Sequence, residues 1–189
     1  MLSMAAPAKK RATYQDLEAV PPHQIAEILN GELVVQPRPA SLHQLATTML
    51  GTELSGPFHA GRGGPGGWVL LYEPELHLGD DVLVPDYAGW RRTRMPIMPD
   101  APAFELAPDW VCEVLSPSTE ARDRTDKLPI YGRENVQHVW FIDPRTRTLE
   151  VLALDGATFR VAGAWRDDAK VRAEPFDAIE LELARLWAR

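Results

Sequence analysis

Two acidic side chains stand inside short apolar runs of this 189-residue sequence. Glu113 lies within residues 109–116 (DWVCEVLS), and Asp86 lies within residues 82–87 (VLVPDY). Strands that are buried on both faces read as continuous apolar stretches, so a carboxylate inside one is unexpected. An unpaired buried carboxylate costs several kcal/mol of stability. The two acids therefore need a compensating partner, and a divalent cation that binds both of them is the best candidate.

Alternation along a strand determines whether the two carboxylates can meet. Glu113 shares a strand face with Val111 and Leu115, and Asp86 shares one with Val84. If the two strands are neighbours, both carboxylates converge, and they repel each other unless they share a proton or a cation. Mg²⁺ or Mn²⁺ suits such oxygen ligands. A cation of this kind lowers the pKa of a bound water and stabilises negative charge in a phosphoryl transition state.

Lys127 lies in the next predicted helix and adds a positive charge, which can orient or deprotonate a nucleophilic water. Each residue also has a structural alternative. Asp86 alone is compatible with an acid at a turn, Glu113 with an ion pair to an arginine such as Arg124, and Lys127 with a solvated helix residue. Together in this order, the three residues predict a site for metal-dependent phosphodiester hydrolysis.

Length and composition are those of an ordinary soluble globular protein, with 45% hydrophobic and 25% charged residues. We expect a flexible N-terminal tail at residues 1–12 and a single domain at residues 13–189. No apolar stretch is long enough to span a bilayer. The single cysteine, Cys112, excludes an intramolecular disulfide and a cysteine-based zinc cluster, and it favours a reducing cytoplasm. The net charge of −7 disfavours a protein that coats nucleic acid but permits a local basic groove.

The elements that must position the site alternate between helices and strands. The patterns predict a mixed central sheet with helices packed on it, an α/β or α+β fold. Asn30-Gly31 predicts a tight hairpin turn between the first two strands. Helices are expected over residues 13–20, 41–54, 125–133 and 176–187. Strands are expected over residues 25–29, 33–35, 68–78, 82–90, 109–115, 136–142, 148–154, 158–164 and 171–173.

Several short motifs occur in a recognisable order along the chain. They are residues 85–86 (PD), 113–119 (EVLSPST), 123–131 (DRTDKLPIY), Glu32 in NGEL, His43 in SLH, and residues 139–144 (VWFIDP). In this order they resemble the Uma-type restriction endonuclease family of the PD-(D/E)XK nuclease superfamily. The resemblance covers roughly residues 13–155, which is most of the chain.

The resemblance implies a restriction-endonuclease-like fold and Mg²⁺-dependent hydrolysis of DNA by a homodimer. It implies that Asp86 and Glu113 are metal ligands, helped by the carbonyl of Val114. Lys127 becomes the catalytic lysine and replaces the superfamily lysine two positions after the glutamate, where this chain has Leu115. The remaining implied site residues are Glu32, as an acid supplied early in the chain, and His43, as a supporting polar residue.

Two other function classes stay open from the sequence. The first is a nuclease-fold protein with weak or lost activity that binds DNA or protein. The acidic net charge favours it, and the intact Asp86, Glu113 and Lys127 argue against it. The second is a serine hydrolase that uses Ser116 or Ser118, which has little support because no Gly-x-Ser-x-Gly motif surrounds either serine.

Overall fold

The structure, a computed structural model, describes residues 10–188. Its α-helices are α1 (Tyr14–Glu18), α2 (Ser41–Leu54), α3 (Glu120–Arg122), α4 (Leu128–Arg133) and α5 (Ala184–Trp187), with π-helical segments η1 (Ser55–His59) and η2 (Asp123–Lys127). Its strands are β1 (Gln24–Leu29), β2 (Glu32–Pro37), β3 (Trp68–Tyr72), β4 (Leu76–Leu78), β5 (Asp81–Leu83), β6 (Tyr87–Arg91), β7 (Trp110–Val114), β8 (His138–Asp143), β9 (Thr148–Asp155), β10 (Thr158–Arg166), β11 (Lys170–Val171) and β12 (Leu181–Glu182).

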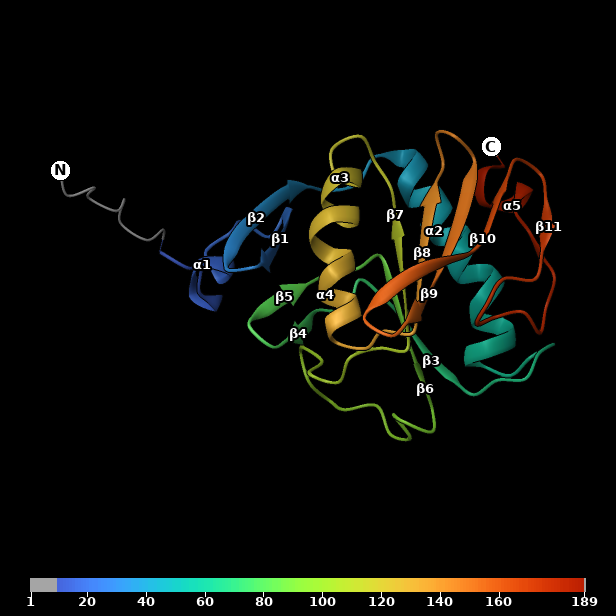
Figure 1. Ribbon diagram of the computed structural model, residues 1–189, viewed down its shortest axis with the longest axis horizontal. Helices are drawn as coiled ribbons and strands as arrows, with labels where there is room; N and C mark the ends of the chain where they lie inside the picture. Colours follow the sequence, from blue (N-terminus) through green and yellow to red (C-terminus); the bar gives the residue numbers. More distant parts are fainter. Residues whose placement is uncertain (1–9, 189) are drawn as a thin grey trace.

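The strands form two main sheets that lie side by side (Figure 1). A six-stranded sheet has the order β10-β9-β8-β7-β6-β3, and only its central β7–β8 pair is parallel. A four-stranded antiparallel sheet has the order β2-β1-β5-β4 and lies beside the larger sheet, at the left of Figure 1. A further pair, β11–β12, lies near the C-terminus. The expected mixed central sheet with flanking helices is confirmed.

One long hairpin connects the two sheets, because both of its arms break. Residues 68–78 and 82–90 pair as expected, but β3 pairs with β6 in the large sheet while β4 pairs with β5 in the small one. Pro74 and Pro85 lie in the two breaks, where a proline cannot donate a ladder hydrogen bond. Asp86 therefore lies at the junction of the sheets rather than inside a continuous strand, and the expectation of one strand over residues 82–90 is wrong.

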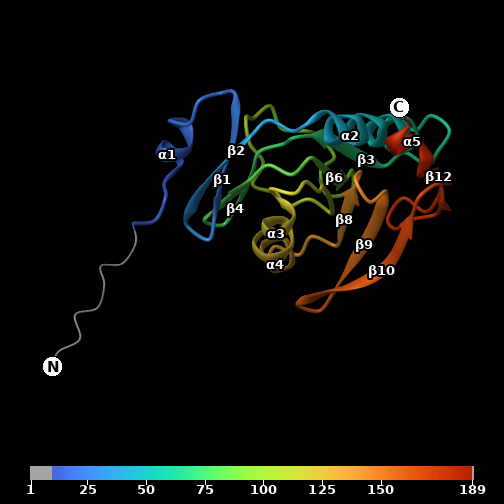
Figure 2. The same cartoon turned by 90° about the horizontal axis from the view of Figure 1, so that it is seen from above.

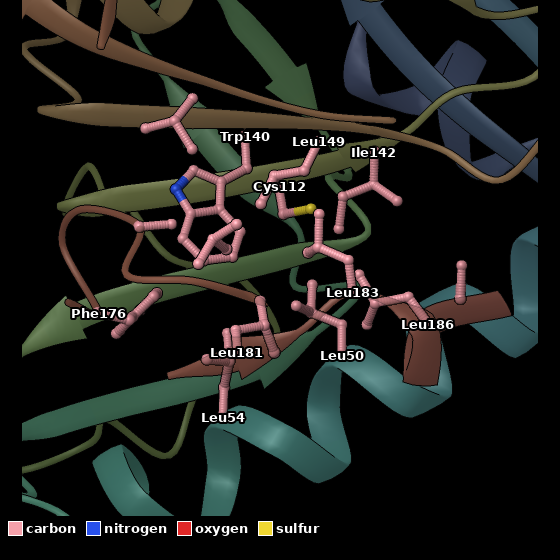
Figure 3. Packing of buried hydrophobic residues seen from close by; sticks show 14 of the residues in the cluster. Leu50, Leu54, Cys112, Trp140, Ile142, Leu149, Phe176, Leu181, Leu183 and Leu186 are labelled. Carbon is pink, nitrogen blue, oxygen red and sulfur yellow. The ribbon is translucent and has the colours of Figure 1, made fainter. Parts of the chain in front are cut away.

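Helices cover both faces of the six-stranded sheet (Figure 2). On one face, Trp110, Cys112 and Val114 pack with Leu50 and Leu54 of α2. Figure 3 shows part of this cluster. On the other face, Val111 and Leu115 pack with Tyr131 of α4. The predicted alternation is thus confirmed, and Glu113 belongs to the face that α4 covers.

The parallel β7–β8 pair requires a crossover, and the crossover delivers Lys127. Residues 120–133 run continuously helical through α3, η2 and α4, so this helical stretch begins five residues before the predicted residue 125. Pro129 lies at the start of α4, directly after the π-helical segment η2. The stretch packs over β7 and brings Lys127 to the face that carries Glu113.

Two other predictions have clear outcomes. The hairpin at Asn30-Gly31 is confirmed, and both residues have the positive φ (55° and 84°) that a tight turn of this kind requires. The predicted helix over residues 176–187 is wrong except for α5. Leu181 and Leu183 are two residues apart, which is strand spacing, and Leu181 pairs with Val171 in β11–β12.

The structure describes only residues 10–12 of the predicted N-terminal tail. Residues 1–9 lie outside the described residues, and the backbone N–H of Ala12 already donates to the carbonyl of Gly31 at 2.8 Å. The domain boundary at residue 13 stays a prediction. None of the helices between residues 10 and 188 is both long and apolar enough to cross a membrane.

Candidate functional site

A cleft of about 220 Å³ opens where the two sheets meet. One wall comes from the end of β2 and the start of α2, and the other comes from the segment that follows β7. The acidic, basic and imidazole side chains that line it are Arg38, His43, Glu73, Asp86, Glu113, Asp123 and Lys127, and Val114 lies among them. The structure therefore brings together every predicted site residue except Glu32.

Asp86 is held in place from two sides. Antiparallel pairing of Tyr87 with Cys112 puts Asp86 next to Glu113 across the β6–β7 boundary. One carboxylate oxygen, Oδ2, accepts a hydrogen bond from the backbone N–H of Val114 at 2.7 Å, and Oδ1 lies 3.1 Å from His43 Nε2. His43, from the first turn of α2, is therefore in position to fix the orientation of this carboxylate.

Glu113 is buried, at 3% exposure, and its side chain accepts hydrogen bonds from Lys127 and Tyr131 of the crossover helix. Its two oxygens lie 3.1 and 3.3 Å from Lys127 Nζ, and Oε1 accepts a 2.5 Å hydrogen bond from the Tyr131 hydroxyl one turn further along. Burial raises the pKa of Glu113 well above its ordinary value, and the nearby carboxylates add to this effect. Arg124, the alternative partner, pairs instead with Glu150 at 2.7 Å.

Lys127 is 2% exposed and is surrounded by acids. Its Nζ lies 2.9 Å from Glu27 Oε1, 3.1 Å from Glu113 Oε1 and 3.6 Å from Asp123 Oδ1. Burial alone would lower the pKa of Lys127, but these three carboxylates outweigh it and raise the pKa well above the ordinary value. Lys127 is therefore an ammonium at neutral pH, suited to orienting a ligand and supplying charge rather than to accepting a proton.

Glu27 is the first of two residues near the site that the sequence did not predict. It lies on β1 with no exposed surface, and its Oε1 accepts a 2.8 Å hydrogen bond from the backbone N–H of Val84 in addition to its contact with Lys127. Its Oε2 is buried and has no hydrogen-bond partner among residues 10–188. The signal was present, because Glu27 interrupts the apolar run of residues 25–29 as Glu113 interrupts its own.

Asp123 is a second missed residue. It lies four positions before Lys127, which is the spacing of helical neighbours, and it is 3% exposed. Burial raises its pKa, although Lys127 opposes that shift. Its i, i+4 relation to Lys127 was visible in the sequence.

The structure does not bring Glu32 into the cleft. This residue is exposed at the start of β2 and lines a separate shallow depression with Lys10 and Arg11. The physical reason is its position beside the hairpin turn, at the end of the small sheet away from the junction. Glu27, on the preceding strand, is the early acid that reaches Lys127.

The donor set fits a hard divalent cation. Four buried carboxylates lie in or beside the cleft, on Glu27, Asp86, Glu113 and Asp123. All but Asp86, which contacts His43, contact Lys127, the only buried lysine or arginine among the described residues. No three His, Cys, Asp or Glu side chains of residues 10–188 are grouped closely enough to hold a metal ion by themselves. Mg²⁺ keeps several waters and uses one or two carboxylates, so this arrangement suits a partly hydrated ion.

Comparison with known proteins identifies the family and the fold. The model of a family named Uma2, described as "Putative restriction endonuclease", matches residues 11–184. A crystal structure from Anabaena variabilis, described as "a putative nuclease belonging to DUF820", is similar with a TM-score of 0.76 and 22% sequence identity, covering 94% of this chain and 98% of that chain. At this identity the likeness shows a shared fold. A search of curated proteins finds no match.

Proposed function

We propose, from the premise that this chain belongs to the Uma2 family, that it is an endonuclease that hydrolyses DNA phosphodiester bonds with Mg²⁺ or Mn²⁺. The observation that carries the proposal is the set of buried charges in and beside the cleft, four carboxylates and one ammonium that contacts three of them. Such an excess of buried acid is costly without a cation. It lies in an open cleft, where a phosphodiester can reach it.

In the proposed mechanism, Asp86, Glu113 and the Val114 carbonyl would hold the cation. A bound divalent cation supplies Lewis-acid stabilisation of a phosphoryl oxygen and lowers the pKa of a coordinated water. His43 and the Val114 N–H orient Asp86, and Tyr131 orients Glu113. Lys127 places a fixed positive charge beside these carboxylates, where it can orient the attacking water and stabilise the transition state.

The partners follow from the family. We propose DNA as the substrate and a homodimer as the assembly, because a cut through both strands requires two sites. Residues 176–187 are unsuited to a dimer interface through their leucines, because Leu181, Leu183 and Leu186 are part of the core. The segment between β6 and β7 is the better candidate, because it exposes Ile97 (84%) and Met98 (52%).

The test is cleavage of supercoiled plasmid and of circular single-stranded DNA with Mg²⁺ or Mn²⁺. We expect Asp86→Ala, Glu113→Gln and Lys127→Met each to lower the rate roughly 100- to 1,000-fold, because each removes electrostatic stabilisation of the transition state. Lys170→Met is the matched control, since it makes the same change at an exposed lysine (58%) that pairs with Glu182 on the β11–β12 pair.

Equal rates in all these proteins would mean that the activity belongs to a contaminant. Metal-dependent binding of DNA without cleavage by the wild-type protein would instead support the alternative of a nuclease-fold binding module. Both results would reject the proposed hydrolysis.

A further inference from the structure

Three carboxylates hold Lys127, and the closest is not the predicted metal ligand. The distance from Lys127 Nζ to Glu27 Oε1 is 2.9 Å, compared with 3.1 Å to Glu113 Oε1 and 3.6 Å to Asp123 Oδ1. The lysine therefore has a partner on β1, in the small sheet, in addition to its partner on β7 in the large one.

Glu113 cannot serve two cations equally well. Its oxygens already receive Lys127 at 3.1 and 3.3 Å and the Tyr131 hydroxyl. An ammonium that relies on Glu113 alone would compete with a divalent cation for the same oxygens, because like charges a few ångström apart repel strongly in a buried site. A second anion that keeps Lys127 paired would weaken this competition.

Glu27 has the features of that second anion. It is fully buried, its Oε1 is fixed by the backbone N–H of Val84 at 2.8 Å, and it is not among the residues that line the cleft. Its Oε2 has no hydrogen-bond partner among the described residues, so the side chain keeps an unused acceptor close to the lysine. Packing and burial thus favour Glu27 as a fixed partner of Lys127 and not as a group that contacts substrate.

We propose that Glu27 is a positioning residue that retains Lys127 in the cleft and thereby leaves Glu113 available to a divalent cation. The inference rests on the metal site of the proposed function and extends it to a residue outside the cleft lining. Glu27 acts through Lys127 and does not itself bind the cation.

The test measures Mn²⁺ affinity of the full chain by isothermal titration calorimetry, without DNA. Glu27→Gln keeps an oxygen that can accept from Val84 but removes the negative charge. We expect it to weaken Mn²⁺ binding roughly 10- to 100-fold, the usual effect of losing a residue that supports a metal ligand. We expect Glu27→Gln/Lys127→Met to restore at least the wild-type affinity, because no ammonium then competes for Glu113.

Glu32→Gln is the matched control, because it makes the same change at an exposed glutamate outside the cleft. Thermal melting of each variant verifies folding. If Glu27→Gln does not fold, Lys127→Met alone decides the question, since we expect it to bind Mn²⁺ at least as tightly as the wild type. Weaker binding by Lys127→Met would overturn the proposal.

Two other results would also overturn it. One is unchanged Mn²⁺ affinity in Glu27→Gln, and the other is a double variant that stays as weak as Glu27→Gln, which would mean that Glu27 does not act through the lysine. Mn²⁺ binding by a wild-type protein that cuts no DNA would reject the proposed hydrolysis while leaving the Glu27 comparison intact. A wild-type protein that binds no Mn²⁺ would reject both.

Discussion

The protein buries acids in two different ways. Asp81 and Asp109 lie outside the cleft, and each has an arginine of its own and a backbone N–H. For Asp81 these are Arg133 at 2.6 Å and the Asn30 N–H at 2.5 Å. For Asp109 they are Arg94 at 3.0 Å and the Arg91 N–H at 2.8 Å. In and beside the cleft, by contrast, four buried carboxylates accompany Lys127, the one buried lysine or arginine among the described residues, and three of them contact it.

The difference separates acids whose charge the fold itself satisfies from the acids that we propose to be functional. A buried carboxylate with its own arginine and an N–H donor has its charge and its hydrogen bonds satisfied, so no further ligand is needed. The cleft acids have a net negative charge that burial makes costly, and evolution retains such arrangements where they do chemistry. Charge balance, rather than burial alone, distinguishes the two regions.

Removing Lys127 should have the largest effect on stability, because the buried carboxylates then have no buried lysine or arginine to offset their negative charge. We expect Lys127→Met to lower the free energy of unfolding by roughly 3–5 kcal/mol at neutral pH, since it leaves buried carboxylates with no cation. Denaturant unfolding of the wild type and the variant measures the difference. A loss below about 1 kcal/mol would show that the cleft acids do not depend on this ammonium.

The loss of stability in Lys127→Met should also depend on pH with a definite sign. Burial raises the pKa of Glu113 above its ordinary value of 4.5 and Lys127 opposes that rise, so the loss of Lys127 raises the pKa further. The folded variant then holds a proton on Glu113 to higher pH than the folded wild type, and its stability falls more as pH rises through that range. The penalty of the variant should therefore be smaller at about pH 5 than at about pH 8, measured as the difference in free energy from the wild type. A penalty that grows on acidification would contradict this account of Glu113.

A divalent cation should stabilise the wild type, because it offsets part of the excess negative charge in the cleft. At about 100 times its dissociation constant, a ligand that binds only the folded state stabilises it by about 2.7 kcal/mol. For a chain of this size that corresponds to an increase in Tm of roughly 5–11 °C. Thermal melts with Mn²⁺, and with Mn²⁺ plus EDTA, measure the shift. Asp86→Ala should abolish it, and an equal shift in that variant would place the cation elsewhere.

Substituting an acid outside the cleft should lower stability without changing the response to Mn²⁺. Asp81→Asn should lower the free energy of unfolding by about 2 kcal/mol, the size of hydrogen bonds to a charged group, because Asp81 joins Asn30 and Arg133. The increase in Tm caused by Mn²⁺ should stay at the wild-type value. A reduced shift in this variant would mean that the two regions are coupled and that the comparison fails.

Much of this arrangement could be predicted from the sequence, and the failures have physical causes. The sequence predicts the apolar strand around Glu113 and the helix that carries Lys127, because hydrophobic runs and helical spacing are local patterns. The broken hairpin was not predicted, although Pro74 and Pro85 mark the two breaks, because only tertiary pairing assigns the halves to different sheets. That break determines where Asp86 lies. The family resemblance indicates Glu32 as the early acid, whereas the interrupted apolar run of residues 25–29 indicates Glu27.

Glu32→Gln therefore provides the smallest expected effect and a direct test of that choice. Because Glu32 is exposed and lies outside the cleft, the substitution should change the free energy of unfolding by less than about 0.5 kcal/mol. The increase in Tm with Mn²⁺ should also match the wild type, whereas Glu27→Gln should reduce it at the same Mn²⁺ concentration, because weaker binding gives less stabilisation. If Glu32→Gln reduced the shift and Glu27→Gln did not, the early acid would be Glu32, and a buried acid at Lys127 would no longer identify the functional region.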